Sequence, residues 1–159
     1  FTDKMPANLW HVPFIRELFP HARFVVTLRD PVETCLSCHV HNLDPSQAYA
    51  TDLEDLARYA EWCARLADHW RGHAPERWLV VQHADVVRDA EAVFRRLCEF
   101  CELPWDAAML RPGGAARPVL TFSRGQVRGA VAPPSLRRAE AYAAHLGPLV
   151  RLRRGPAPA

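Results

Sequence analysis

The stretch RFVVTLRDPVETCLSC, residues 23–38, decides the fold of this chain. Its first part is a short run of apolar and β-branched residues that ends at Arg29, as is typical of a buried strand in a parallel sheet. A helix is expected to follow at once, because Asp30 can cap it, Pro31 suits its first position, and Glu33 completes a capping box. The stretch therefore predicts a strand, a sharp turn and a helix.

The alternation of strand and helix continues along the chain. Thr51 and Glu54 form a second capping box, which predicts a helix that ends near Gly72. Residues 77–82, RWLVVQ, repeat the buried-strand pattern, and Asp89 then introduces an amphipathic helix. This order predicts an α/β fold in which helices flank a parallel sheet.

Three other segments are less regular. Residues 7–19 have helical spacing, with Pro13 either kinking the helix or marking its first turn. Residues 104–134 carry Pro, Gly and Arg without periodicity and are expected to form a long loop. A last helix is expected over residues 135–146, capped by Ser135.

The 159 residues include 49% apolar residues and 14 prolines, which suits one globular domain. We expect residues 1–150 to be the C-terminal part of a single domain and residues 151–159 to be a frayed tail. The chain opens on Phe1 rather than Met, so an N-terminal portion is expected to be missing. No stretch has the apolar length that a membrane span or a signal peptide requires, which predicts a cytoplasmic location.

Positive charge is concentrated in the last third of the chain. Residues 111–159 hold nine arginines and one acid, Glu140, whereas the whole chain has a net charge of +2. An alternative function is therefore that of a module that binds nucleic acid or another polyanion. Phe122 and Tyr142 are the only aromatic residues there and no nucleic-acid motif is present, so a nucleic-acid partner is not favoured.

Arg29 and Ser37 together indicate an anion site. Arg29 stands where the first strand ends, and ligands of open α/β sheets bind at that carboxyl edge. The helix start that follows adds unpaired N–H groups, which suit a phosphate. Ser37 lies about two helical turns further on, where its hydroxyl can point back along the same side. The alternative is that Arg29 pairs with Asp30 or Glu33 and that Ser37 is simply a small helix residue.

Three segments carry a family resemblance: FTDKMPAN at residues 1–8, RFVVTLRDPVETCLSC at 23–38 and CELPWD at 101–106. They resemble the bacterial sulfotransferases, particularly those with attached tetratricopeptide repeats and a kinship to tyrosylprotein sulfotransferases. The resemblance covers most of residues 1–150. It implies a fold like that of P-loop nucleotide kinases, here incomplete at its N-terminus. It also implies transfer of a sulfuryl group from 3′-phosphoadenosine 5′-phosphosulfate to an acceptor.

The resemblance implies roles for single residues. In the family, the strand-end arginine and the serine eight residues later hold the donor's 3′-phosphate, and here these are Arg29 and Ser37. Lys4 matches the lysine that approaches the 5′-phosphosulfate. Thr121, Phe122 and Ser123 resemble the segment that borders the adenine. The acceptor is a hydroxyl or an amine in the family, and protein tyrosine, a glycan and a small alcohol all stay open.

Several positions depart from the family pattern. His83 stands where the family usually has a tyrosine near the adenine, and it can stack or hydrogen-bond there instead. Pro133 replaces an arginine of the relatives. A second cation for the 3′-phosphate is therefore expected from the arginines that remain nearby, with Arg138 preferred over Arg128 and Arg137.

Two further departures concern catalysis. The family has a glycine-containing loop for the 5′-phosphosulfate, and no such loop precedes Phe1, so the fragment is expected to be inactive alone. Pro6 replaces the histidine that is the general base of the cytosolic members, and an upstream carboxylate is one candidate for that role. A degenerate relative that folds without catalysing is the second alternative function.

Two C-x-x-C motifs, at residues 35–38 and 98–101, raise the question of a zinc site. Both lie in predicted amphipathic helices without turn glycines, so buried reduced thiols are the favoured interpretation. His69 and His73 are four residues apart around Gly72 and are expected to be a solvated pair. Sulfuryl transfer itself calls for no metal, because Arg, Lys and backbone N–H groups can hold the donor's anionic groups.

Overall fold

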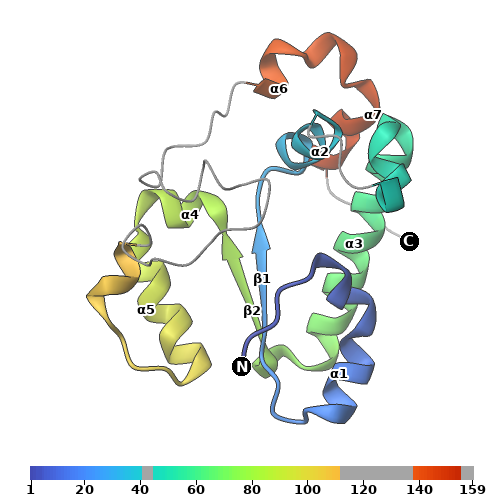
Figure 1. Ribbon diagram of the computed structural model, residues 1–159. Helices are drawn as coiled ribbons and strands as arrows, with labels where there is room; N and C mark the ends of the chain where they lie inside the picture. The colour runs from blue at the N-terminus through green and yellow to red at the C-terminus, as the bar shows by residue number, and fades with distance from the viewer. Residues whose placement is uncertain (41–44, 112–137, 155–159) are drawn as a thin grey trace.

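The computed structural model describes residues 1–40, 45–111 and 138–154 of the chain (Figure 1). Seven α-helices lie in these ranges: α1 Val12–Leu18, α2 Pro31–Val40, α3 Leu53–His73, α4 His83–Arg88, α5 Ala90–Cys101, α6 Arg138–Ala141 and α7 Gly147–Val150. The 3₁₀ turns in the same ranges are Pro6–His11, Pro45–Thr51, Pro75–Arg77, Ala107–Leu110, Ala143–His145 and Arg151–Arg154. None of the described helices is long and apolar enough to cross a membrane.

Two parallel strands form the sheet of the described residues. They are β1, Phe24–Leu28, and β2, Trp78–Gln82, paired in register from Phe24 opposite Trp78 to Leu28 opposite Gln82. Both predicted strands are thus confirmed to within one residue. In Figure 1, α4 and α5 lie on the β2 side of the pair, and α1 and α3 lie on the β1 side. Helices with a parallel sheet confirm the α/β class, while the kinase-like arrangement stays a prediction.

The predicted turn from β1 into α2 is present, with a difference at its capping box. The backbone N–H of Glu33 donates to Asp30 Oδ1 at 2.9 Å, and Pro31 is the first helical residue. The carboxylate of Glu33 does not complete the box. It is buried and accepts a hydrogen bond from the backbone N–H of Ala139 instead.

The cap of α3 is Asp52 rather than Thr51, so that prediction is wrong by one residue. Asp52 Oδ1 accepts from the backbone N–H groups of Glu54 and Asp55 at 2.8 and 3.0 Å. The hydroxyl of Thr51 donates to the carbonyl of Ala48, inside the preceding 3₁₀ turn. At the other end, α3 runs one residue past Gly72. By contrast, the predicted cap of α5 is confirmed, because Asp89 accepts from Ala92 N.

The N-terminal segment follows one of the two predicted forms. A 3₁₀ turn over Pro6–His11 is followed by α1, and Pro13 lies in the first turn of that helix. The indole N–H of Trp70 donates to the carbonyl of Leu9 at 3.2 Å, which holds this segment against α3. Pro13 therefore marks a helix start rather than a kink.

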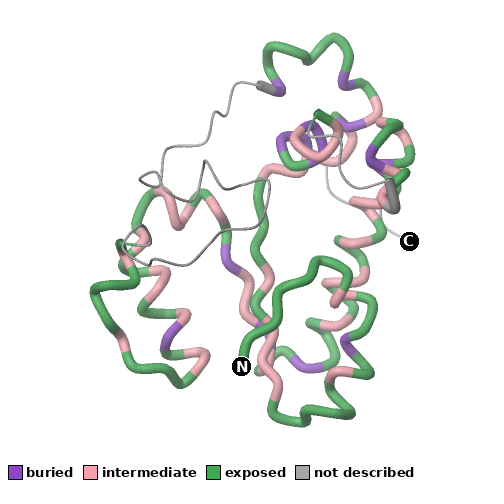
Figure 2. Tube along the Cα trace, viewed as in Figure 1, coloured by how far each residue is buried: buried purple, intermediate pink, exposed green. Residues whose placement is uncertain are grey.

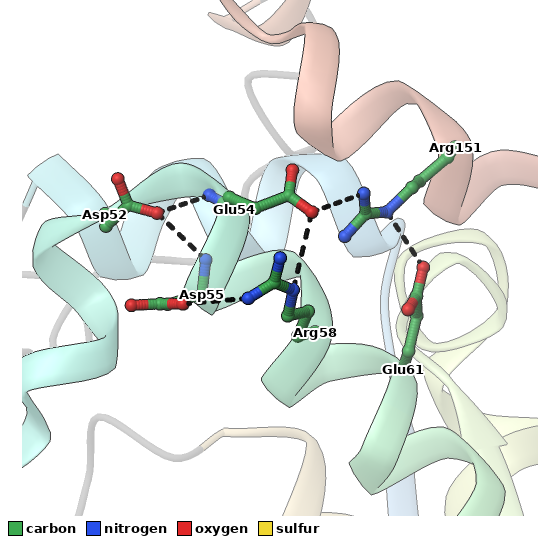
Figure 3. Close-up of polar contacts among 6 residues, drawn as sticks. All are labelled: Asp52, Glu54, Asp55, Arg58, Glu61 and Arg151. Carbon is green, nitrogen blue, oxygen red and sulfur yellow. Dashed lines mark hydrogen bonds and ion pairs between the residues drawn. The ribbon is translucent and has the colours of Figure 1, made fainter.

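The C-terminal segment is more broken and better anchored than expected. In place of one helix over residues 135–146, the described part has the short helices α6 and α7 separated by a 3₁₀ turn. Arg151, where fraying was expected to begin, contacts α3 through two carboxylates (Figure 3). Its Nη1 lies 2.7 Å from Glu54 Oε1 and its Nε lies 3.0 Å from Glu61 Oε1. The chain is thus still packed at Arg151.

The buried core joins α2 to α3 and to the C-terminal helices (Figure 2). It lies beyond the carboxyl end of β1, where α2 begins. Its members are Val32, Cys35, Leu36, Leu56, Ala57, Ala139, Leu146 and Leu149. The helix that carries Ser37 is therefore fixed by apolar packing against α3 and against the C-terminal helices.

Replacement of Asp52 tests the α3 cap. Asp52→Ala should lower the free energy of unfolding by about 1 kcal/mol, because two backbone N–H groups lose their acceptor. Asp52→Asn keeps an accepting oxygen and is expected to stay close to wild type. Urea denaturation measures the free energy of unfolding of both variants. A larger loss of this free energy for Thr51→Ala than for Asp52→Ala would show that Thr51 caps α3.

Candidate functional site

The candidate site lies at the edge of the sheet where both strands end. Arg29 directly follows β1, and His83 directly follows β2 and begins α4. Leu28 and Gln82, the residues before them, are register partners. The parallel pairing therefore brings two residues that are 54 positions apart to the same edge, which is where open α/β sheets bind ligands.

Arg29 contacts a buried carboxylate without being covered by it. Its Nη2 lies 3.8 Å from Glu33 Oε2, and its side chain is 34% exposed, against 4% for Glu33. The alternative predicted from the sequence, in which Arg29 pairs with Glu33, is thus present as an ion pair. This distance exceeds that of a hydrogen bond, so Glu33 pairs with Arg29 through charge while part of the arginine side chain stays exposed.

Ser37 shares a helix face with this ion pair. It lies one turn beyond Glu33 on α2 and is partly buried. Residues spaced by four on a helix are surface neighbours, so Ser37 lies next to Glu33, whose carboxylate is paired with Arg29. This placement is what the predicted 3′-phosphate pair requires, and convergence of Arg29 and Ser37 on one phosphate remains a prediction.

The other predicted site residues are spread over the chain. Lys4 is exposed and precedes the 3₁₀ turn that Trp70 holds against α3. His83 is partly buried at the sheet edge. The segment Thr121, Phe122 and Ser123 lies outside the described residues, as does the side chain of Arg138, although the backbone of Arg138 begins α6.

Two contacts that the sequence analysis missed involve Asp30 and Glu33, the acids that follow Arg29 in the chain. The backbone N–H of Ala139 donates to Glu33 Oε1 at 2.9 Å, and Arg153 Nε lies 3.3 Å from Asp30 Oδ2. Both acids next to Arg29 thus contact the C-terminal segment. The four-residue spacing of Arg29 and Glu33 was a usable signal, but nothing in the local sequence points to Ala139 or Arg153.

The cysteines of the two C-x-x-C motifs lie on different helices, α2 and α5. Burial, together with the neighbouring Cys38, Cys63 and Asp30, raises the pKa of Cys35 to about 12. Burial also raises the pKa of Cys38 and of Cys63. Thiols with such pKa values stay protonated near neutral pH, where metal binding and redox exchange need thiolates.

Other candidate ligands do not gather either. Within the described ranges, no three Cys, His, Asp or Glu side chains are placed to hold a metal ion. His69 and His73 are exposed, with ring centroids 4.4 Å apart, and a ring nitrogen of His73 bonds to the carbonyl of His69. This geometry is that of a solvated pair at a helix end.

Comparison with known proteins identifies one family. The model described as "Sulfotransferase family" matches residues 1–107. A protein-tyrosine sulfotransferase A of Caenorhabditis elegans is 27% identical over 114 residues, which are 68% of this chain and 29% of that protein. An uncharacterized protein of Aquifex aeolicus (strain VF5) is 28% identical over 154 residues, which are 95% of this chain and 20% of that protein.

These matches agree with the resemblance carried by residues 1–8, 23–38 and 101–106, all inside the region matched by the family model. The chain spans less than a third of the length of either relative.

The thiol environment predicts how the cysteines react. At pH 8 about one Cys35 side chain in ten thousand is ionised, so alkylation by iodoacetamide should spare it in the folded protein. Mass spectrometry of the labelled protein between pH 7 and pH 9 measures this, with urea-unfolded protein as the control in which every cysteine reacts. Rapid labelling of Cys35 in the folded state would contradict the burial assigned to it.

Proposed function

This chain belongs to the sulfotransferase family, and from that premise we propose that it provides the donor 3′-phosphate site of a protein that transfers a sulfuryl group from 3′-phosphoadenosine 5′-phosphosulfate. The observation that carries the proposal is the position of Arg29. It stands at the carboxyl edge of parallel strands, and its side chain is 34% exposed. The helix that begins just after it carries Ser37 two turns further on. Because the chain covers only part of its relatives, transfer is proposed for the full-length protein.

Arg29 and Ser37 are proposed to bind the donor's 3′-phosphate. A guanidinium presents parallel N–H groups that match two phosphate oxygens, and a serine hydroxyl adds one adjustable donor. The family match includes both residues, because it spans residues 1–107. Arg138 is proposed as a further cation, and the bond from Ala139 to Glu33 supports it by holding the start of α6 against α2.

The adenine is proposed to lie along the same edge of the sheet. His83 begins α4 directly after β2 and offers a ring that can stack on a base or hydrogen-bond to it. Thr121, Phe122 and Ser123 are proposed, from the family resemblance alone, to border the adenine.

Lys4 is proposed to stabilise the transition state. In the reaction, the acceptor oxygen bonds to sulfur while the bond from sulfur to the bridging oxygen breaks, and a base takes the acceptor's proton. Adenosine 3′,5′-bisphosphate then leaves with negative charge on its 5′-phosphate. An ammonium placed at the bridging oxygen stabilises that charge as it develops.

A protein tyrosine is the first acceptor to test. The name of the Caenorhabditis elegans relative gives that acceptor class for that protein, and 68% of this chain aligns with it. Acceptor pockets are built from loops that vary between relatives of one fold, so a glycan or a small alcohol is the next acceptor to test.

Replacement of Arg29 tests the donor site. In the full-length protein, Arg29→Ala should weaken binding of adenosine 3′,5′-bisphosphate by about 2 to 4 kcal/mol, because a phosphate loses a bidentate charged partner. Ser37→Ala should cost less, about 1 kcal/mol, because one neutral donor is lost. Isothermal titration calorimetry measures both. Affinity for adenosine 5′-phosphate, which lacks the 3′-phosphate, is the control and should hardly change.

Replacement of Lys4 separates catalysis from binding. Lys4→Ala should lower the single-turnover rate of sulfuryl transfer to a tyrosine peptide about a hundredfold, with donor affinity nearly unchanged, because its interaction forms in the transition state. Arg16→Ala, which removes another exposed cation of the N-terminal segment, is the matched control and should keep the rate. Equal loss in both variants would show a general effect of charge.

A further inference from the structure

Glu33 is the one charged side chain that is buried in the described part of the molecule, with 3% of the residue exposed. Burial of a carboxylate costs free energy unless charged or hydrogen-bonding partners compensate it. Its helix neighbours Val32 and Leu36 are apolar members of the core, so apolar packing alone does not account for an acid here.

The two carboxylate oxygens of Glu33 serve different elements. Oε1 accepts the backbone N–H of Ala139 at 2.9 Å, across 106 residues of sequence. Oε2 lies 3.8 Å from Nη2 of Arg29. One side chain on α2 thus joins the arginine at the sheet edge to the first turn of α6.

The same end of α2 has a second contact to the C-terminal segment. Asp30, which caps α2, lies 3.3 Å from Arg153. Two acids within one turn of Arg29 would repel a phosphate if their charges were unbalanced. Arg153 balances Asp30, and Glu33 is held by Ala139 on one side and Arg29 on the other.

We propose that Glu33 is a positioning residue for the 3′-phosphate: it orients the guanidinium of Arg29 and couples that orientation to the docking of the C-terminal segment at Ala139. The inference rests on the proposed function of Arg29. The buried carboxylate limits the directions in which the arginine can point, so less freedom is lost when a phosphate binds. Since coupling is reciprocal, phosphate binding at Arg29 also stabilises the contact at Ala139.

The test replaces the charge of Glu33 and keeps its hydrogen bond. In Glu33→Gln an amide oxygen can still accept from Ala139, but the countercharge beside Arg29 is gone. In the full-length protein, affinity for adenosine 3′,5′-bisphosphate should fall about tenfold, the size of one charge-assisted contact, with affinity for adenosine 5′-phosphate unchanged. Glu33→Asp, which keeps the charge but shortens its reach, should show a smaller fall.

Glu54→Gln is the matched control. It weakens another contact between the same C-terminal segment and α3, because Glu54 of α3 pairs with Arg151 (Figure 3). It should leave the ratio of the two nucleotide affinities as in wild type. A double variant, Glu33→Gln with Arg29→Ala, should bind both nucleotides like Arg29→Ala alone, because a positioning residue acts only through the residue it positions.

The outcomes distinguish the positioning role of Glu33 from the proposed 3′-phosphate site on which it rests. If wild type binds both nucleotides equally, the proposed 3′-phosphate site fails. If wild type prefers the bisphosphate and Glu33→Gln keeps or strengthens that preference, the site stands and the positioning role is overturned. An equal loss for both nucleotides would likewise assign Glu33 a purely structural role.

Discussion

The hydrogen bond from Glu33 N to Asp30 Oδ1 fixes where α2 begins, and the candidate site depends on that position. Only Arg29 and Asp30 separate the end of β1 from the start of α2, so Arg29 is kept at the sheet edge. The apolar side of α2 then packs against α3 and α7, which prevents the helix from rotating. Because the turn is held at both ends, the backbone from which the Arg29 side chain extends has a fixed position.

The proposed anion site lies next to two acids, and contacts from the C-terminal segment offset the charge of both. Arg153 contacts Asp30, and the backbone of Ala139 contacts Glu33, so neither carboxylate depends on Arg29 alone. The arginine-rich composition of residues 111–159 therefore has a structural explanation in part. Among the described arginines of that region, Arg151 and Arg153 pair with acids of α3 and α2, which accounts for their charge without a nucleic-acid partner.

Local features of the fold were predictable from the sequence, and distant contacts were not. β1, β2 and the cap of α5 at Asp89 follow from patterns of a few residues, so their information is contained in the segment itself. The cap of α3 was missed because Thr51 and Asp52 are adjacent residues of similar capping propensity, and only the backbone shows which one lies at the helix start. The partners of Glu33 and Arg151 are about a hundred residues away, where no local pattern reaches.

Helix α2 combines core packing with the proposed binding of the 3′-phosphate. Val32, Cys35 and Leu36 enter the core, while Glu33, which pairs with Arg29, and Ser37 lie one turn apart on the helix. The raised pKa of Cys35 is a consequence of the same burial, which keeps its thiol neutral. The packing of Val32, Cys35 and Leu36 thus fixes the helix on which the proposed site of Arg29 and Ser37 is built.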